Sequence, residues 1–230
     1  MAHSASHTPQ EGFTLVELLI SILLTSIIMG AIYSVYRVQT HSAKVQEMRQ
    51  EAQEYARSVM DIMVREIRNA GYNPASASST TCTGTIVPGA PGVITATATS
   101  FRFTYDFQDP GGGAPNSLCN DTNEDITYDF ATTGCPSGFG NVTRQDGGNP
   151  AQALTDCNIP DVTGQRLDLR YFTQAGAELS RPVTGADLAT IQRVLITLTV
   201  QSKKPDAQFG GQLNAQMSSN ADLRNRGLPQ

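Results

Sequence analysis

Apolar residues are concentrated in one uninterrupted run near the start of the chain. Residues 13–36 read FTLVELLISILLTSIIMGAIYSVY, and Glu17 is the only charged residue among them. At about 1.5 Å per residue, a helix of this length extends roughly 36 Å, enough to cross a hydrocarbon core of about 30 Å. The alternative is a buried helix of a soluble protein, but such helices are rarely apolar on all faces for this length. The pattern predicts a transmembrane helix over residues 13–36, preceded by a polar leader over residues 1–12.

The next segment, residues 37–71, changes to an amphipathic pattern without a break. Residues 37–70 contain neither Pro nor Gly, and apolar residues recur every three or four positions. This spacing places them on one face of a helix, and Gly71 supplies a stop signal. We therefore expect one continuous helix over residues 13–70. The apolar stripe of its second half consists of Val45, Met48, Ala52, Tyr55, Val59, Ile62, Met63 and Ile67.

The remaining chain is rich in turn residues and short strand signals, and it is divided into a globular domain (72–204) and a tail (205–230). Within the tail, residues 212–226 are predicted to form an edge strand or a flexible end. These patterns predict an α+β protein in which the long N-terminal helix packs on a mainly antiparallel sheet with long disulfide-linked loops. The predicted strands are 93–98, 100–106, 126–130, 166–172 and 191–201. The helix stripe is expected to bury against Leu167, Leu169, Tyr171, Val194, Ile196 and Leu198.

Composition narrows the function classes. The formal net charge is −5, which argues against a nucleic-acid-binding protein. The three His residues (His3, His7 and His41) offer little material for catalysis or metal ligation, and no G-x-S-x-G, P-loop or HExxH motif occurs. The sequence therefore predicts a protein that is not an enzyme and needs no cofactor.

Four cysteines, Cys82, Cys119, Cys135 and Cys157, all lie in the turn-rich body. An even number of cysteines in an exported domain indicates two disulfides, for which three pairings exist. Cys82–Cys119 together with Cys135–Cys157 is slightly favoured because neighbouring pairs close the shortest loops. A zinc site is the alternative, but there is no CxxC spacing and no His follows His41.

One segment of the body resembles the start of a calcium-binding loop. Its polar residues Asp121, Asn123 and Asp125 occupy every second position, as the first three ligands of an EF-hand loop do. The pattern departs from that loop at the sixth position, where Ile126 replaces Gly, and at the twelfth, where Thr132 replaces Glu. The alternative is a polar turn before the strand at 126–130.

The start of the apolar run holds the most specific motif. A leader ending in Gly12, then Phe13, then an apolar run with Glu17 at its fifth residue resembles the processing site of type IV prepilins and type II secretion pseudopilins. The resemblance implies that a prepilin peptidase cleaves between Gly12 and Phe13 and methylates the new amine of Phe13. A secretory signal peptide is the competing interpretation, but its apolar segment would precede the cleavage site.

Glu17 is a functional candidate because a carboxylate within a membrane span costs a few kcal/mol. The resemblance implies that it pairs with the N-terminal amine of a neighbouring subunit during assembly. The alternative is that its side chain reaches the membrane interface, since it lies only five residues into the run.

Further segments are similar to the PilW family of minor pilins. They are residues 62–72 at the end of the helix and the combination of residues 126–128 with 191–200. This resemblance implies a minor type IV pilin, incorporated at the tip of a pilus, that helps to initiate assembly and acts in piliation, twitching motility or adhesion. The implied partners are other pilin subunits, the inner-membrane assembly platform and a tip adhesin. The alternatives are a minor pseudopilin of a type II secretion system and a membrane-tethered extracellular binding module.

The charges that flank the apolar run conflict with this motif. The leader contains no Lys or Arg, whereas Arg37 and Lys44 follow the run, so the positive-inside rule alone would place the body in the cytoplasm. The prepilin motif requires the leader on the cytoplasmic side. The prediction is a single-pass inner-membrane protein with a periplasmic body, later part of an extracellular pilus. A start codon upstream of Met1 would also explain the missing basic leader.

Overall fold

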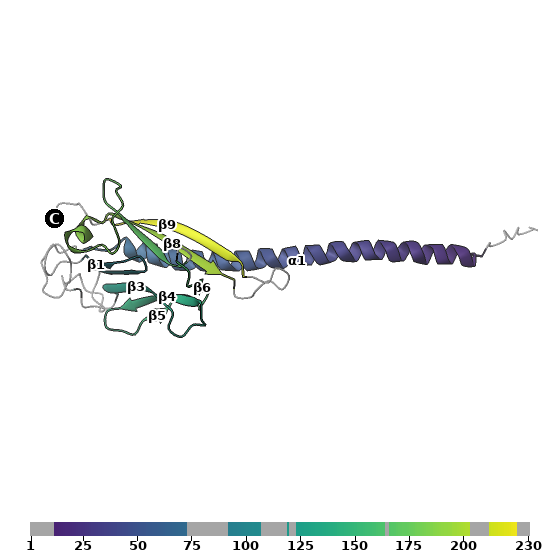
Figure 1. Ribbon diagram of the computed structural model, residues 1–230, viewed down its shortest axis with the longest axis horizontal. Helices are drawn as coiled ribbons and strands as arrows, with labels where there is room; N and C mark the ends of the chain where they lie inside the picture. The colour runs from purple at the N-terminus through teal and green to yellow at the C-terminus, as the bar shows by residue number, and fades with distance from the viewer. Residues whose placement is uncertain are drawn as a thin grey trace, which may run out of the picture. The chain divides into compact units, whose positions relative to one another are not determined.

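The fold is described from a computed structural model (Figure 1), for residues 12–72, 92–106, 119, 123–163, 166–202 and 212–224. Internal contacts divide the chain into two compact units, one ending at Glu47 and one beginning at Met48. The elements are, in chain order, α1 (Leu15–Ile67), β1 (Val93–Ala96), β2 (Ser100–Thr104), β3 (Asp125–Ala131), β4 (Phe139–Asp146), β5 (Gln152–Ala153), β6 (Ile159–Pro160), β7 (Asp168–Phe172), a 3-10 helix η1 (Gly185–Thr190), β8 (Arg193–Gln201) and β9 (Asn214–Asp222).

The predicted long helix is confirmed as α1, which ends a few residues earlier than expected. After Ile67 the chain makes a turn, and Gly71 adopts a left-handed conformation with a φ of 77°. The N–H of Gly71 donates to the carbonyl oxygen of Thr104 at 3.0 Å, so the chain leaves the helix directly onto β2. Glycine suits this position because it adopts positive φ without the steric cost of a Cβ.

The strands form two antiparallel sheets rather than the single sheet that the sequence predicted. One sheet has the order β1–β2–β3–β4–β5, with β6 also paired to β4, and the other has the order β7–β8–β9. The segments 126–128 and 191–200 therefore lie in different sheets. In Figure 1 the three-stranded sheet, green to yellow, runs alongside the C-terminal part of α1.

The C-terminal part of α1 buries its apolar face in one core shared with both sheets. The predicted sheet partners are fully buried in this core, and so are Met63 and Ile67 of the helix. The buried face is broader than the predicted stripe because Ala56, Met60 and Val64 are buried as well. Ile62 and Tyr55 are only partly buried. The full set of predicted partners consists of Leu167, Leu169, Tyr171, Val194, Ile196 and Leu198.

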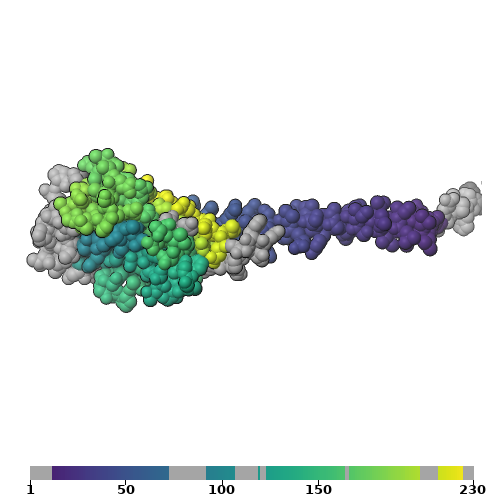
Figure 2. Space-filling model, in the orientation of Figure 1, coloured from purple at the N-terminus to yellow at the C-terminus, as the bar shows by residue number. Residues whose placement is uncertain are grey.

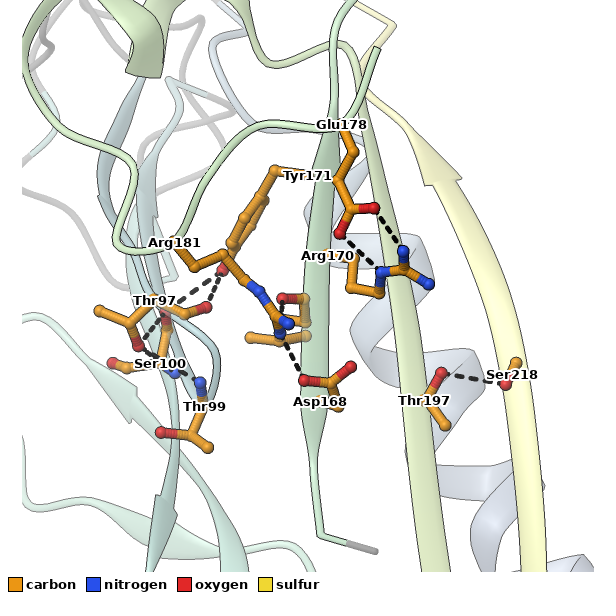
Figure 3. Close-up of polar contacts among 11 residues, drawn as sticks. Thr97, Thr99, Ser100, Asp168, Arg170, Tyr171, Glu178, Arg181, Thr197 and Ser218 are labelled. Carbon is orange, nitrogen blue, oxygen red and sulfur yellow. Dashed lines mark hydrogen bonds and ion pairs between the residues drawn. The ribbon is translucent and has the colours of Figure 1, made fainter. Parts of the chain in front are cut away.

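A buried tyrosine links the two sheets. The hydroxyl of Tyr171 on β7 donates to the carbonyl oxygen of Thr97, after β1, at 2.7 Å (Figure 3). Nearby, the N–H of Leu169 donates to the carbonyl oxygen of Ala98 at 2.8 Å. Burial raises the pKa of Tyr171 well above its usual value of 10.0, because the phenolate would be poorly solvated there.

An ion-pair network joins α1 to the first sheet. The carboxylate of Glu66 accepts a hydrogen bond from the Tyr128 hydroxyl at 2.5 Å and another from Nε of Arg144 at 3.0 Å. Nη2 of Arg144 also donates to Oδ1 of Asn123 at 2.8 Å. Because the Glu66 and Arg144 side chains are each only 17% exposed, this contact fixes the rotation of the helix against β3 and β4.

Candidate assembly helix

The predicted processing site lies at the very start of the described chain, and it is exposed. Phe13 is 79% exposed, and a Cβ placed on Gly12 would meet no atom within 4 Å. Both residues precede α1, which begins at Leu15. The peptide bond between Gly12 and Phe13 therefore lies in non-helical chain, on the surface of the part of the protein that the structure describes.

Thr14 begins the helix, a role that the sequence analysis did not assign. Its Oγ1 accepts a hydrogen bond from the N–H of Glu17 at 3.3 Å, and its carbonyl oxygen accepts one from the N–H of Leu18 at 3.2 Å. A Thr followed three residues later by Glu is the sequence signature of a capping box, so the pattern Thr14-x-x-Glu17 was the available signal. The cap leaves Phe13 just outside the helix and Glu17 in its first turn.

The carboxylate of Glu17 is exposed at the N-terminal end of α1. A negative charge in the first turn is favoured by the helix dipole. Among the described residues, none forms an ion pair with Glu17. The geometry leaves its carboxylate accessible to a positively charged group of another molecule.

The first half of α1 presents an apolar surface on all sides. Its large apolar side chains from Leu15 to Val38 are between 53% and 75% exposed. Within the described residues, this is the one helix long and apolar enough to cross a membrane, and none of its most apolar stretch is buried. This stretch is therefore not part of the core that the described residues form. The exposed apolar surface fits membrane anchoring.

Four serine and threonine hydroxyl groups in this half are hydrogen-bonded inside the helix. Ser21, Thr25, Ser26 and Ser34 each donate to a carbonyl oxygen three or four residues earlier, at 2.7 to 2.8 Å. A hydroxyl moved into lipid without a partner would cost several kcal/mol, roughly 4–8 on alkane scales. These internal hydrogen bonds remove most of that penalty, so the four polar residues are compatible with a lipid-facing or helix-facing position.

The predicted cysteine sites lie in the body, away from this helix. Cys135 and Cys157 form a disulfide, the pairing that loop length favoured. Cys119 is also disulfide-bonded, and it is 7% exposed. Cys82 lies outside the described residues.

Two of the three candidate calcium ligands contact arginines. Oδ1 of Asn123 accepts a hydrogen bond from Arg144, and the carboxylate of Asp125 accepts two from Arg102, at 3.0 and 2.7 Å. Asn123 has a φ of 69°, as expected for a turn residue. Asp121 lies outside the described residues. Among the residues that are described, no group of three or more His, Cys, Asp or Glu side chains is placed to hold a metal ion.

Comparison with known proteins supports the N-terminal motif. Residues 8–33 match the family model of the prokaryotic N-terminal methylation motif, which is typical of type IV pilins and pseudopilins. No curated protein and no solved structure matches the chain. The motif and the exposed apolar helix are similar to those of type IV pilins and pseudopilins, so they support a pilin-like or pseudopilin-like protein. In general, such a motif implies interaction with the pilin assembly machinery.

Proposed function

We propose that this chain is a minor type IV pilin of the PilW type, which enters a pilus filament and helps to initiate its assembly. The observation that supports this most directly is the match of residues 8–33 to the methylation motif, on a helix whose first half is exposed and apolar. Before assembly, the subunit resides in the inner membrane through residues 13–36, with its body in the periplasm. A position at the pilus tip, with roles in motility or adhesion, follows from the PilW resemblance.

Processing is proposed to occur at the exposed bond between Gly12 and Phe13. A prepilin peptidase removes residues 1–12 and methylates the freed amine of Phe13. Because Thr14 caps α1, the scissile bond precedes the first helical turn and is not protected by helical hydrogen bonds. The mature chain then begins with a positively charged secondary amine directly before the helix.

Glu17 is proposed to guide assembly through the amine of a neighbouring subunit. Its carboxylate has no ion-pair partner among the described residues, and it lies within an apolar surface. Two opposite charges in an apolar environment favour each other strongly, because each alone would bear a large desolvation cost. Pairing Glu17 with the methylated amine of Phe13 in the next subunit would neutralise both groups and set the axial position of the two helices.

The test compares Glu17→Ala with Glu54→Ala, which alters an exposed carboxylate farther along α1. Sheared surface filaments and membrane fractions are probed for the protein. We expect Glu17→Ala to remain in the membrane at normal levels, since losing a charge favours insertion, but to disappear from the filament fraction. Glu54→Ala should behave as the unmodified protein. Normal filaments containing Glu17→Ala would contradict the role of Glu17, and a defect only in protein secretion would favour a type II pseudopilin.

A further inference from the structure

The strand β9 forms an edge of the three-stranded sheet that no other described strand covers. Its nine residues pair with β8 along their whole length. Two further hydrogen bonds lie just beyond the ends of this pairing. The N–H of Leu223 donates to the carbonyl oxygen of Gln192 at 2.9 Å. At the other end, the N–H of Ser202 donates to the carbonyl oxygen of Leu213 at 2.8 Å. In an antiparallel pair, hydrogen-bonded and non-hydrogen-bonded residue pairs alternate. Because Leu213 and Leu223 are both bonded to the β8 chain, the backbone groups of the odd-numbered residues of β9 are the ones that bond to β8. The residues whose N–H and C=O groups point away from β8 are Asn214, Gln216, Ser218, Asn220 and Asp222.

The other sheet edges in the described part of the chain are short or covered. β1 has an irregular register and is bridged at Ala96 by Val183. β5 has only two residues. The outer side of β7 is covered, because Leu179 donates its N–H to the carbonyl oxygen of Tyr171.

β9 lacks the devices that natural proteins use to block an edge. It has no Pro, no Lys and no register shift. Figure 2 shows β9, in yellow, at the surface of the body. An edge of this length offers a ready template for one more strand.

We propose that this edge pairs with β9 of a second copy of the chain, antiparallel and centred on Ser218. The strand reads NAQMSSNAD, and reversal about Ser218 brings similar residues together. Ala215 faces Ala221 of the second copy, Gln216 faces Asn220, and Ser218 faces its own equivalent. In this register every outward-pointing residue meets an outward-pointing residue, so each facing pair exchanges two backbone hydrogen bonds. The same patch serves both copies, as a two-fold interface requires.

The charges on β9 permit this pairing. Asp222 is the only charged residue of the strand, and it faces the amide of Asn214 in the second copy. Its carboxylate already pairs with Arg193 on β8 at 3.1 Å. No like charges meet across the interface, so the electrostatic repulsion that opposes most edge-to-edge contacts is absent.

The direction of β9 determines which copies can pair. Within the body, β9 runs in the same direction as the end of α1. Ser202, which is bonded to Leu213 just before β9, lines the same small pocket as Tyr55 of α1, and Arg224, just after β9, donates its N–H to the carbonyl oxygen of Arg68. A two-fold pairing reverses this direction in the second copy. If the proposed function holds, subunits within one filament share one direction, so the pairing would join copies from two filaments.

Cross-linking of the full chain in detergent micelles tests the proposal. Ser218→Cys places a thiol on the two-fold axis, with Cα atoms about 5.5 Å apart in a facing pair. Thr197→Cys is the matched control, since Thr197 lies beside Ser218 on β8, with their hydroxyls 3.0 Å apart (Figure 3). The Thr197 equivalents would be three strand spacings apart, about 14 Å. None of the cysteines that the structure describes is free to compete.

We expect a short bismaleimide to convert most Ser218→Cys to a covalent dimer and to leave Thr197→Cys monomeric. A monomeric Ser218→Cys, or equal cross-linking of both variants, would overturn the proposal. Sedimentation in micelles provides a second measurement. Ser218→Pro removes one outward N–H and no bond to β8, so it should sediment as a monomer, while Ser218→Ala should remain a dimer. A dimeric Ser218→Pro with unchanged melting temperature, or a monomeric unmodified chain, would also contradict the pairing.

Discussion

Removing the carboxylate of Glu66 should loosen the attachment of α1 to the first sheet. Glu66→Ala deletes the acceptor of the Tyr128 hydroxyl and the ion-pair partner of Arg144. Tyr128 is fully buried, so its hydroxyl would lose its partner without access to water. Hydrogen bonds to charged groups contribute about 1.5–3 kcal/mol each. Because Arg144 retains its contact with Asn123, we expect a net loss of about 3 kcal/mol in the free energy of unfolding.

This loss translates into a melting temperature lower by about 6–12 °C, at about 2–4 °C per kcal/mol for a unit of this size. Thermal unfolding of the full chain in detergent is followed by near-ultraviolet circular dichroism. The chain contains seven Tyr and no Trp, so the signal reports the packing of tyrosines such as Tyr128 rather than the helicity of α1. Glu54→Ala on the exposed face of α1 is the control and should shift the midpoint little. A Glu66→Ala midpoint equal to that of Glu54→Ala would refute the stabilising role of the network.

Other predictions concern the body. Gly140→Ala should lower the stability by about 1–3 kcal/mol in denaturant unfolding, because the added Cβ would lie 2.5 Å from the Phe130 ring. The free energy of unfolding should fall as the pH rises above 10. The pKa of Tyr171 is raised in the folded state, so the unfolded chain loses the phenolic proton at a lower pH than the folded chain does. Alkaline unfolding monitored by tyrosinate absorbance checks this. Replacing Cys135 and Cys157 by Ser should cost about 3 kcal/mol, measured by urea unfolding, because their bond closes a loop with a separation of 22 residues.

Periodicity was sufficient to predict the helix and the strongest strands. Apolar spacing predicted α1 and the burial of Met63 and Ile67, and alternation predicted β2 and β8. The predicted stripe was too narrow because a single row at spacings of three and four positions omits the neighbouring residues Ala56, Met60 and Val64, which are buried as well.

β4 and β9 show where the sequence pattern is insufficient. β4 reads FGNVTRQD and buries only Gly140 and Val142, so its polar residues hide the alternation. β9 reads NAQMSSNAD, and its position is determined by pairing with β8 rather than by its own residues. Strands of this kind are specified by their neighbours, which a single sequence does not show.

The candidate processing and assembly residues could be predicted from the sequence, whereas the ion-pair network of Glu66 could not. Gly12, Phe13 and Glu17 are close together in the chain, so local spacing was enough to single them out. The contact of Glu66 with Arg144 joins residues 78 positions apart, and only the folded chain brings them together. No short-range pattern contains that information.

The most direct test of the proposed pilin function is the N-terminus of the mature protein. Mass spectrometry of the chain recovered from the membranes of the cells that produce it identifies the first residue and any modification. The proposed function predicts a terminal peptide that begins at Phe13 with a methylated amine. An intact leader that still begins at Met1, or cleavage at another position without methylation, would contradict processing as a type IV pilin.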